Sequence, residues 1–465
     1  MAPTGQLIDA DRPRVPRPTA HRRSRPGPAP RPGVVDALLA LAGLGFGVTL
    51  ALVITGESRG TLAAPGGLST AGGRLAAFTG SYLLLLMVVL VARLPWLERA
   101  VGQDRLVRLH RRIAPWAVGL ISAHVVLVTL GYARQARVGP FHQFWIFLTT
   151  YPDILAAAVG FALLLMAAVT SIRIARRRLR YETWWVVHLY VYLALALAFA
   201  HQIVTGVAFV GHPLTRLAWI AVWAATAGTV IVFRILHPIA RNLRHQLKVV
   251  AVREDAPGVF SVVCSGRKIS RLAVSGGQFF QWRFLTRELW WHAHPYSLSA
   301  MPHPPYLRIT VKALGDQSRA VSRLRPGTRI FVEGPYGAFT RHALTTDRVT
   351  LIGAGVGITP LRALLEDLPD WVGVTVLVRA STVDDIVHRR EIAELVRQRS
   401  GVFHELVGPR HQARIDAATL HRMVPDIADG DVYVCGPTGF DEAVVDAATR
   451  LGVRRDQLHL EAFSF

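Results

Sequence analysis

Six apolar stretches dominate the first half of the chain, and polar segments separate them. Each stretch is close to the ~20 residues that a helix needs to cross the hydrocarbon core of a bilayer. They cover approximately residues 34–55, 75–92, 113–131, 152–172, 184–204 and 217–236. Residues 1–33 are instead rich in Pro and Arg and contain no apolar block, which is typical of a disordered tail. The pattern predicts a six-helix α transmembrane bundle over residues 34–236.

After about residue 246 the pattern changes to short alternating segments. QLKVVAVRED, VFSVVCSG and GQFFQWRF indicate antiparallel strands and predict a small β-barrel domain over 246–343. From residue 347 strands alternate with helices. RVTLIGAG precedes a helix from about 359, VGVTVLVRAS precedes one from about 385, and DGDVYVCGP precedes a third. This order predicts an α/β domain over 347–465, with cofactors at the carboxyl ends of its strands.

The charge balance becomes informative once these segments are located. The 465 residues carry a formal net charge of +22, yet only 18% of them are charged and 51% are hydrophobic, which is unusual for a wholly soluble enzyme. Arginines cluster in every second connection, within 93–112, 173–180 and 234–244. The positive-inside rule then places the N-terminus and everything after residue 236 in the cytoplasm. We therefore expect a multi-pass protein of the cell membrane.

Four histidines fall in two of the predicted spans. His110 and His124 belong to the third span, and His188 and His201 belong to the fifth. Histidine is costly inside a bilayer and marks a candidate functional site, although a single one could simply bond a neighbouring helix. Both spans run in the same direction, so each contributes one histidine at an inner level and one at an outer level, roughly 20 Å apart. Two such pairs suit two stacked haems, each held between two imidazoles.

The histidine spacing fits one of these helices better than the other. A separation of fourteen, from His110 to His124, returns to nearly the same face of a straight helix, about 40° away. The separation of thirteen, from His188 to His201, lands about 140° away. The fifth span therefore needs a local irregularity or a different ring orientation. The shortage of Asp and Glu within the spans excludes a di-metal carboxylate site.

Two turns in the α/β domain suit a nucleotide. In GAGVGITP, Gly353, Gly355 and Gly357 stand where a strand becomes a helix. Glycines there let a pyrophosphate approach the backbone, and the helix N-terminus supplies amide donors. The segment CGP at 435–437 closes a later strand, and we expect it to face the same crevice. Either turn alone is compatible with a purely structural role.

Two motifs in the barrel domain suit a flavin. HPYSLS at 294–299 ends a strand, and its aromatic ring with an adjacent hydroxyl matches the edge of an isoalloxazine. KALGDQS at 312–318 combines a lysine, a glycine turn and the expected start of a helix. A cation and a helix N-terminus suit the pyrophosphate of FAD.

The order of these motifs resembles the ferredoxin–NADP reductase superfamily. The resemblance is carried by HPYSLS, KALGDQS, VEGPYG at 332–337, GAGVGITP and CGP. Because six spans with paired histidines precede them, residues 34–465 resemble the ferric reductase and NADPH oxidase family of transmembrane flavocytochromes b. A member of this family is expected to combine a haem-binding bundle, an FAD domain and an NAD(P)H domain.

The resemblance also implies roles for individual residues. His110 with His188 would ligate the inner haem, and His124 with His201 the outer haem. The residues that would contact FAD are His294, Pro295, Tyr296, Ser297, Lys312, Gly315, Gln317 and Ser318. The residues that would bind the nicotinamide cofactor are Gly353, Gly355, Gly357, Thr359, Gly436 and Pro437, with Cys435 beside the nicotinamide. Phe465 would shield the flavin ring until nicotinamide displaces it, and Phe463 is the alternative for this role.

The sequence therefore predicts a membrane oxidoreductase that passes electrons from cytosolic NAD(P)H through FAD and two b-type haems to an outer acceptor such as ferric iron or oxygen. Arg379 follows the second strand of the α/β domain, where an arginine can pair with a 2′-phosphate and favours NADPH; the alternative is an ordinary surface arginine. Two other hypotheses are an electron-supply subunit for a partner redox protein or quinone, and a flavin reductase anchored by its spans. The paired histidines argue against the anchored reductase. Membrane topology explains the basic charge, so no nucleic-acid partner is expected.

Overall fold

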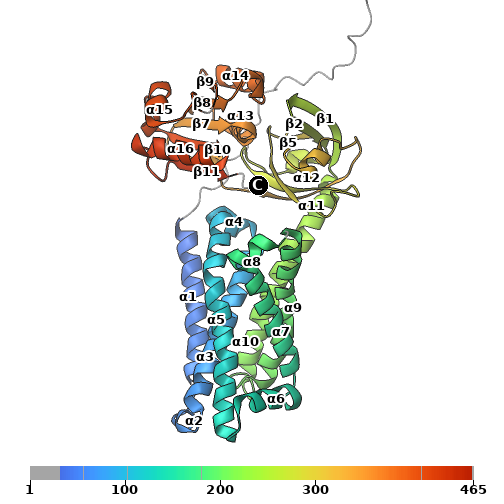
Figure 1. Cartoon of the computed structure of the whole chain (residues 1–465), viewed down its shortest axis with the longest axis vertical. Helices are drawn as coiled ribbons and strands as arrows, with labels where there is room; N and C mark the ends of the chain where they lie inside the picture. Colours follow the sequence, from blue (N-terminus) through green and yellow to red (C-terminus); the bar gives the residue numbers. More distant parts are fainter. Residues whose placement is uncertain (1–31, 56, 102, 180, 410, 463–465) are drawn as a thin grey trace, which may run out of the picture.

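The computed structural model describes residues 32–462, apart from 56, 102, 180 and 410. Long helices form one end of the molecule, and two lobes that contain β-sheets sit at the other end (Figure 1). The helices come from the first half of the chain and the lobes from the second. Residues 1–31 of the expected tail, and Phe463 and Phe465, lie outside the described residues.

The bundle is built from long helices that run along a common direction (Figure 1). They are α1 (Pro32–Thr55), α3 (Gly67–Leu90), α5 (Gln103–Ala136), α7 (Ile154–Ser171), α9 (Tyr181–Thr205) and α10 (Pro213–Val230), the last continuing through the π-helical turn η1 (Ile231–Leu236) into α11 (His237–His245). Short helices lie at both ends. They are α2 (Arg59–Ala63) and α6 (Pro140–Thr150) away from the lobes, and α4 (Pro95–Val101) and α8 (Arg173–Arg178) beneath the lobes.

Five helices of the described chain are long and apolar enough to cross a membrane. They are α3, α5, α7, α9 and the continuous helix from α10 to α11. The stretch expected at 34–55 is also helical, but its apolar part, Leu39–Ile54, is shorter than the others. By length and composition the described residues therefore contain five candidate spans, and the expected sixth is not confirmed.

Glycines at heptad spacing let α3 and α5 pack closely. Gly66, Gly73 and Gly80 follow one another at intervals of seven along this part of the chain. A Cβ on Gly73 would lie 2.7 Å from Val128 Cγ2, and one on Gly66 would lie 2.1 Å from the carbonyl oxygen of Gly131. Both distances are far below van der Waals contact, so only glycine fits. Close backbone approach of this kind stabilises helix pairs in membranes, where packing replaces the hydrophobic effect.

The lobe above α11 contains two three-stranded antiparallel sheets. One has the order β1 (Lys248–Ala256), β2 (Val259–Ser265), β5 (Tyr306–Lys312), and the other has the order β4 (His294–Ser297), β3 (Phe279–Phe284), β6 (Ile330–Tyr336). Trp282 of β3 and Ile309 of β5 pack in one core shared by both sheets. A single bridge from Leu298 to Ile309 links the sheets. A closed barrel is therefore not confirmed, and the described strands form two linked sheets with the short helix α12 (Asp316–Val321).

The other lobe is built around five parallel strands. Their order is β11 (Leu458–Ala462), β10 (Asp431–Gly436), β7 (Arg348–Ala354), β8 (Gly373–Ala380), β9 (Val402–Val407). The accompanying helices are α13 (Ile358–Asp367), α14 (Arg389–Gln398), α15 (Ala417–Met423) and α16 (Thr438–Arg450). Because β7 and β10 are neighbours in register, the turns GAGVGITP and CGP meet at the same edge of the sheet.

Two contacts tie strand β6 to the bundle. Asn242 of α11 donates from Nδ2 to the carbonyl of Val332 and accepts the amide of Val332 on Oδ1, both at 2.8 Å. At the turn between α3 and α4, the Arg93 guanidinium lies 4.1 Å from the centroid of the Tyr336 ring. The Arg93 guanidinium also donates to Glu98 over 3.4 Å. The sheet that carries the HPYSLS motif is therefore fixed to the bundle at two points, helix α11 and the turn between α3 and α4.

Candidate cofactor sites

The four candidate histidines form two pairs inside the bundle. The rings of His110 on α5 and His188 on α9 have centroids 6.2 Å apart. His124 and His201, further along the same two helices, line one cavity. The structure therefore brings together the same residues that were paired from the sequence.

Helix α9 carries its two histidines without a break. It is α-helical throughout from Tyr181 to Thr205, so the local irregularity considered for the spacing of thirteen is not present. The remaining explanation is that the His188 and His201 side chains leave the helix in different orientations.

The spacing of the first pair fits a metal held between two imidazoles. A metal–imidazole bond is about 2 Å long and the ring centroid lies about 1 Å beyond the bonded nitrogen, so opposed rings have centroids about 6 Å apart. The rings of His110 and His188 meet this requirement. The described residues contain no group of three or more His, Cys, Asp or Glu side chains that could hold a metal. The distance between the two rings agrees with a centre that has two protein ligands, as in bis-histidine haem.

Backbone carbonyls of α3 orient both histidines of α5. His110 Nδ1 lies 3.2 Å from the carbonyl oxygen of Met87, and His124 Nδ1 lies 3.0 Å from that of Gly73. A carbonyl oxygen can only accept, so each Nδ1 carries the hydrogen and each Nε2 keeps its lone pair. Metal-binding histidines typically make this outer hydrogen bond. These two partners were not predicted, because a backbone carbonyl has no side-chain signature in the sequence.

The histidines of α9 have weaker hydrogen bonds, although the His188 ring stacks on Trp184 with centroids 5.2 Å apart. His188 Nδ1 lies 3.4 Å from Ser171 Oγ, which donates to the carbonyl of Ala167 and accepts from the indole of Trp184. Nδ1 of His201 is buried and has no hydrogen-bond partner among the described residues.

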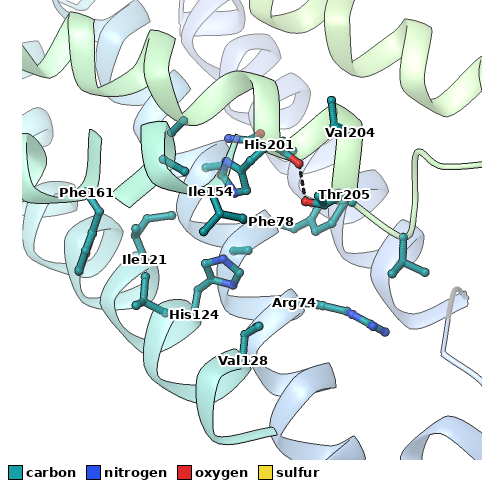
Figure 2. A pocket seen from close by; sticks show the side chains of 18 of the residues that line it. Arg74, Phe78, Ile121, His124, Val128, Ile154, Phe161, His201, Val204 and Thr205 are labelled. Atoms are coloured by element: carbon teal, nitrogen blue, oxygen red, sulfur yellow. Dashed lines mark hydrogen bonds between the residues drawn. The ribbon is translucent and has the colours of Figure 1, made fainter. Parts of the chain in front are cut away.

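A cavity of about 670 Å³ surrounds the second pair. Figure 2 shows His124 and His201 reaching into it, among apolar side chains that include Ile121 and Phe161. Arg74 also lines the cavity and forms a salt bridge of 2.8 Å with Glu57. The volume falls in the range of ~300–1,000 Å³ typical of small-molecule pockets. The two imidazoles and the apolar walls fit a large planar cofactor.

Strand β4 concentrates polar groups without partners. Ser297 pairs with Phe279 of β3, which also pairs with Tyr336 of β6. The rings of His294 and Tyr296 stack with centroids 5.7 Å apart. Ser297 Oγ and His294 Nε2 are buried without hydrogen-bond partners in the described chain, and burial lowers the pKa of His294 to about 4. A neutral imidazole, a free hydroxyl and a stacked phenol suit the edge and face of a flavin ring.

The other residues expected to contact FAD lie nearby in the same lobe. Pro295 is exposed on β4, and Lys312 ends β5 with an exposed side chain. Gly315 caps α12, and Ser318 Oγ accepts the amide of Gly315 over 2.9 Å. Gln317 lies in the same first turn and is half-buried. Because the Ser318 hydroxyl is used within the turn, Lys312 is the group of this segment best suited to a phosphate.

The three positions of GAGVGITP require glycine for different structural reasons. Gly355 has a φ of +56° and open space where a Cβ would point, which leaves room for a ligand. A Cβ on Gly357 would lie 2.2 Å from the carbonyl oxygen of Cys435. A Cβ on Gly353 would lie 2.9 Å from a side-chain atom of Ile358. Gly353 and Gly357 therefore allow β7, β10 and α13 to pack, and Gly355 allows a pyrophosphate to approach.

The remaining residues of the nucleotide edge are partly committed to protein contacts. The Thr359 hydroxyl donates to the carbonyl of Val356 over 2.8 Å. Arg379, near the end of β8, donates from Nη2 to the carbonyl of Gly408 over 3.0 Å. The guanidinium thus lies beside the loop that follows β9, at the carboxyl ends of the strands.

The CGP turn brings a buried acid that was not predicted from the sequence. Cys435 is wholly buried, and burial raises the pKa of its thiol well above the ordinary value. Gly436 ends β10 and Pro437 caps α16, on whose buried face lies Asp441. Asp441 Oδ1 has no hydrogen-bond partner in the described chain, and burial raises the pKa of this carboxyl to about 7. The signal in the sequence was an acid in line with Val444 and Ala448 on the apolar face of α16.

Family models match three consecutive parts of the chain. Residues 76–199 match the ferric reductase like transmembrane component, residues 246–340 an FAD-binding domain, and residues 351–446 an oxidoreductase NAD-binding domain. The first match contains His110, His124 and His188 and ends two residues before His201. The second contains HPYSLS and KALGDQS, and the third contains both nucleotide turns. The matches follow the same order as the bundle and the two lobes.

Curated relatives match only part of the chain. The ferredoxin reductase component of 3-ketosteroid-9-alpha-monooxygenase from Mycolicibacterium smegmatis is 32% identical over 227 residues, which is 46% of this chain and 64% of the relative. The flavohemoprotein of Vibrio cholerae is 32% identical over 182 residues, 36% of this chain and 45% of the relative. The chain thus spans less than two thirds of the length of these relatives.

A solved structure also matches part of the chain. The FAD/NAD-binding domain of nitric oxide dioxygenase from Vibrio cholerae is 25% identical, with a TM-score of 0.39 over 47% of this chain and 98% of that domain. The three family matches, in the order of the bundle, the two-sheet lobe and the α/β lobe, show what the chain is composed of. It is a fusion of a ferric reductase-like transmembrane domain with a ferredoxin–NADP reductase-type FAD- and NAD-binding module.

Proposed function

We propose that this protein takes electrons from NAD(P)H in the cytoplasm, passes them through FAD and two b-type haems, and delivers them to an acceptor at the outer face of the membrane. His110 and His188 would hold the haem nearer the flavin, and His124 and His201 the haem further from it. Ferric iron and oxygen are the acceptors that suit a ferric reductase or NADPH oxidase type of enzyme.

The presence of two histidine pairs at two levels of one bundle carries this proposal. His110 and His124 are fourteen residues apart on α5, which is roughly 21 Å along a helix. Each keeps Nε2 available, because Nδ1 is bound to a carbonyl of α3. A flavin reductase that used its helices only as an anchor would have no need for two oriented pairs.

The chain would bind and orient its cofactors rather than donate or accept protons. Bound FAD accepts a hydride and releases single electrons, which a haem with two imidazole ligands can relay without binding substrate. Gly355 leaves room for the dinucleotide pyrophosphate, Ser297 and the neutral His294 meet the flavin, and the carbonyls of Gly73 and Met87 keep two imidazoles in the ligating tautomer.

The distribution of arginines supports a cytoplasmic position for the two lobes. α8 carries the segment RIARRR, and α11 carries arginines at 241 and 244. Both helices lie at the end of the bundle that faces the lobes (Figure 1). The positive-inside rule then assigns this end to the cytoplasm and the end with α2 and α6 to the outer face.

Arg379 supports NADPH over NADH as the donor. It lies at the end of β8, next to the glycine-rich turn of β7, where the 2′ position of a bound dinucleotide is expected. Its contacts with the carbonyls of Gly408 and Ala413 hold the guanidinium at this edge of the sheet. The guanidinium has five N–H groups, so hydrogens on Nη1 and Nη2 beyond those used in the protein contacts can still be donated to a phosphate.

The deciding experiment is a reduced-minus-oxidised visible spectrum of the full-length protein in detergent. NADPH is added without oxygen, and haem and flavin are quantified per chain. We expect one FAD and two low-spin b haems, all reduced by NADPH. Flavin without haem, in protein made with haem available, would refute the role of the histidine pairs and favour the anchored flavin reductase. Direct reduction of ferric chelates or oxygen, compared with a quinone or a redox protein, then separates an enzyme from an electron-supply subunit.

A further inference from the structure

An ionic cluster joins the FAD lobe to the NAD lobe. Arg308 of β5 donates from Nη1 and Nη2 to the two carboxylate oxygens of Glu391 on α14, each over 2.7 Å. Arg362 of α13 places Nε 2.9 Å from Glu391 Oε2. One carboxylate of the NAD lobe therefore forms an ion pair with an arginine from each lobe. The Arg308 pair is hydrogen-bonded, whereas Arg362 Nε lies within ion-pair distance without forming a hydrogen bond. The two arginine side chains are 18% and 10% exposed, and the Glu391 side chain is 40% exposed, so solvent reaches the cluster from the side of the carboxylate.

Each arginine of this cluster leads directly to a candidate cofactor site. Arg308 also donates to Ser299, from Nε to the hydroxyl over 3.1 Å and from Nη2 to the carbonyl over 3.2 Å. Ser299 is the last residue of HPYSLS, two positions after Ser297. Arg362 belongs to α13, the helix that starts at the glycine-rich nucleotide turn. The cluster thus connects the HPYSLS segment with helix α13 through the side chains of Arg308, Glu391 and Arg362.

Two further contacts hold α13 against the FAD lobe. The amide of Met301 donates to Glu366 Oε2 over 2.8 Å, and the amide of Gly276 donates to Asp367 Oδ2 over 3.0 Å. A Cβ on Gly276 would lie 2.3 Å from the carbonyl oxygen of Ala363, so the two backbones touch. Glu366 is bonded to Arg362 as well. The distance between the two lobes is therefore set along α13 by directional bonds at several points.

We propose that Arg308, Glu391 and Arg362 are positioning residues that set the distance between nicotinamide and flavin for hydride transfer. The role rests on the proposed function, in which a C–H bond of NAD(P)H breaks and its electron pair leaves with the hydrogen to bond flavin N5. NAD(P)H is then oxidised to NAD(P)⁺, and FAD is reduced to its anionic dihydro form. None of the three side chains needs to touch either ring. Their effect is geometric, and a displacement of about 1 Å can slow such a reaction about 100-fold.

The test uses Glu391→Gln, which keeps the shape of the side chain and removes the charge that holds both arginines. Full-length protein in detergent is mixed rapidly with saturating NADPH without oxygen, and bleaching of the flavin absorbance is followed. We expect the limiting rate of flavin reduction to fall about 10- to 100-fold, with little change in the NADPH concentration that gives half of that rate. The matched control is Glu394→Gln on the same helix. Glu394 forms an ion pair with Arg397 of its own helix, over 2.7 Å, and its variant should keep the wild-type rate.

A second measurement separates positioning from general stability. Stacking of nicotinamide on flavin gives a long-wavelength charge-transfer band, and this band should weaken in Glu391→Gln at unchanged flavin content. Arg308→Lys keeps the charge but cannot form the two-pronged bond, so it should show an intermediate rate. If Glu391→Gln does not retain flavin, Arg308→Lys is the variant that tests the positioning role.

The outcomes are distinguishable. Wild-type rates and a wild-type band in flavin-loaded Glu391→Gln, or in Arg308→Lys if the first variant lacks flavin, would overturn the positioning role and leave the proposed function intact. A wild-type protein whose flavin is not reduced by NADPH or NADH would overturn the proposed function, and the positioning role with it.

Discussion

Replacing Gly73 with alanine is expected to release the outer haem and leave the inner haem in place. The carbonyl of Gly73 is the group that holds His124 Nδ1, at 3.0 Å. An added methyl would lie 2.7 Å from Val128 Cγ2, 3.0 Å from the Val128 amide nitrogen and 3.2 Å from Leu127 Cβ. The nearest contacts involve a stiff β-branched side chain and backbone, so the helices themselves must separate.

The size of the effect follows from these distances. Carbon atoms in contact lie about 3.5–4.0 Å apart, so α3 and α5 must move apart by about 1 Å at this level. Overpacking of this kind costs about 1–3 kcal/mol. The same movement lengthens the bond to His124 beyond hydrogen-bond range and removes about 1 kcal/mol more. A total of about 2–4 kcal/mol corresponds to a loss of about 30- to 900-fold in outer-haem affinity if all of it falls on haem binding.

The assay is haem content per chain, measured on purified protein together with the reduced-minus-oxidised spectrum. Wild type should carry two haems, and Gly73→Ala one. The adjacent Gly72→Ala is the matched control, because its methyl would meet only Leu127 Cδ1 at an ordinary 3.7 Å. His124→Ala defines the spectrum of a protein with the inner haem alone. Equal haem content and equal spectra in the Gly72 and Gly73 variants would refute the argument that close packing of α3 on α5 orients His124.

Three further predictions test other parts of the molecule. Arg93→Met removes the cation that lies 4.1 Å from the Tyr336 ring and joins the bundle to the sheet that carries HPYSLS. This variant should slow haem reduction without slowing flavin reduction. Stopped-flow traces at the haem and flavin absorbance maxima check this, and equal slowing of both would contradict it. Arg379→Ala should raise KM for NADPH about tenfold and leave KM for NADH unchanged, since only NADPH carries the 2′-phosphate; steady-state kinetics with both donors decide. Burial raises the pKa of the Asp441 carboxyl from 3.8 to about 7, so between these pH values the folded protein binds a proton that the unfolded chain does not. Wild-type stability should therefore fall as pH rises through this range. Melting curves followed by flavin release should lack that fall in Asp441→Asn, and identical pH profiles of the two proteins would contradict the prediction.

Much of the fold could be predicted because it depends on local pattern. The helix expected from about 359 begins at Ile358, and the strand before it is β7, which ends at Ala354. Apolar length alone located α3, α5, α7 and α9, since a bilayer demands about 20 apolar residues in a row. The nucleotide turns were predictable for the same reason: their glycines, their strand and their helix are contiguous in the chain.

Features that depend on distant pairings could not be predicted from local pattern. Closure of the barrel depends on which strands bond each other, and the structure divides them between two sheets. The bond between Arg308 and Glu391 joins residues 83 positions apart, and no spacing rule connects them. Asp441 was overlooked because an acid in an amphipathic helix is ordinarily solvated. Its burial becomes visible only when α16 is packed on β10.

The separation of the two histidines on α5 has a structural counterpart on α3. His124 bonds the carbonyl of Gly73 and His110 bonds that of Met87. The two histidines are fourteen residues apart on α5, and their two partners are fourteen residues apart in the opposite direction on α3. The close approach of Gly66 to Gly131 repeats the relation one heptad further on. Helices that coil around each other at ~3.5 residues per turn return to the same face after fourteen residues. This removes the offset of about 40° calculated for a straight helix.

No such register supports α9. Its histidines are thirteen residues apart. His188 lies within hydrogen-bond distance of a serine hydroxyl on α7 and stacks on Trp184, and Nδ1 of His201 has no hydrogen-bond partner in the described chain. We infer that α5 presents two imidazoles whose positions the backbone of α3 has already set, while those of α9 adjust to the cofactors when they bind. An alanine at Gly73 would disturb the fixed partner of a pair. The freer histidine opposite would not compensate, because its own position would depend on the haem that the first one is proposed to hold.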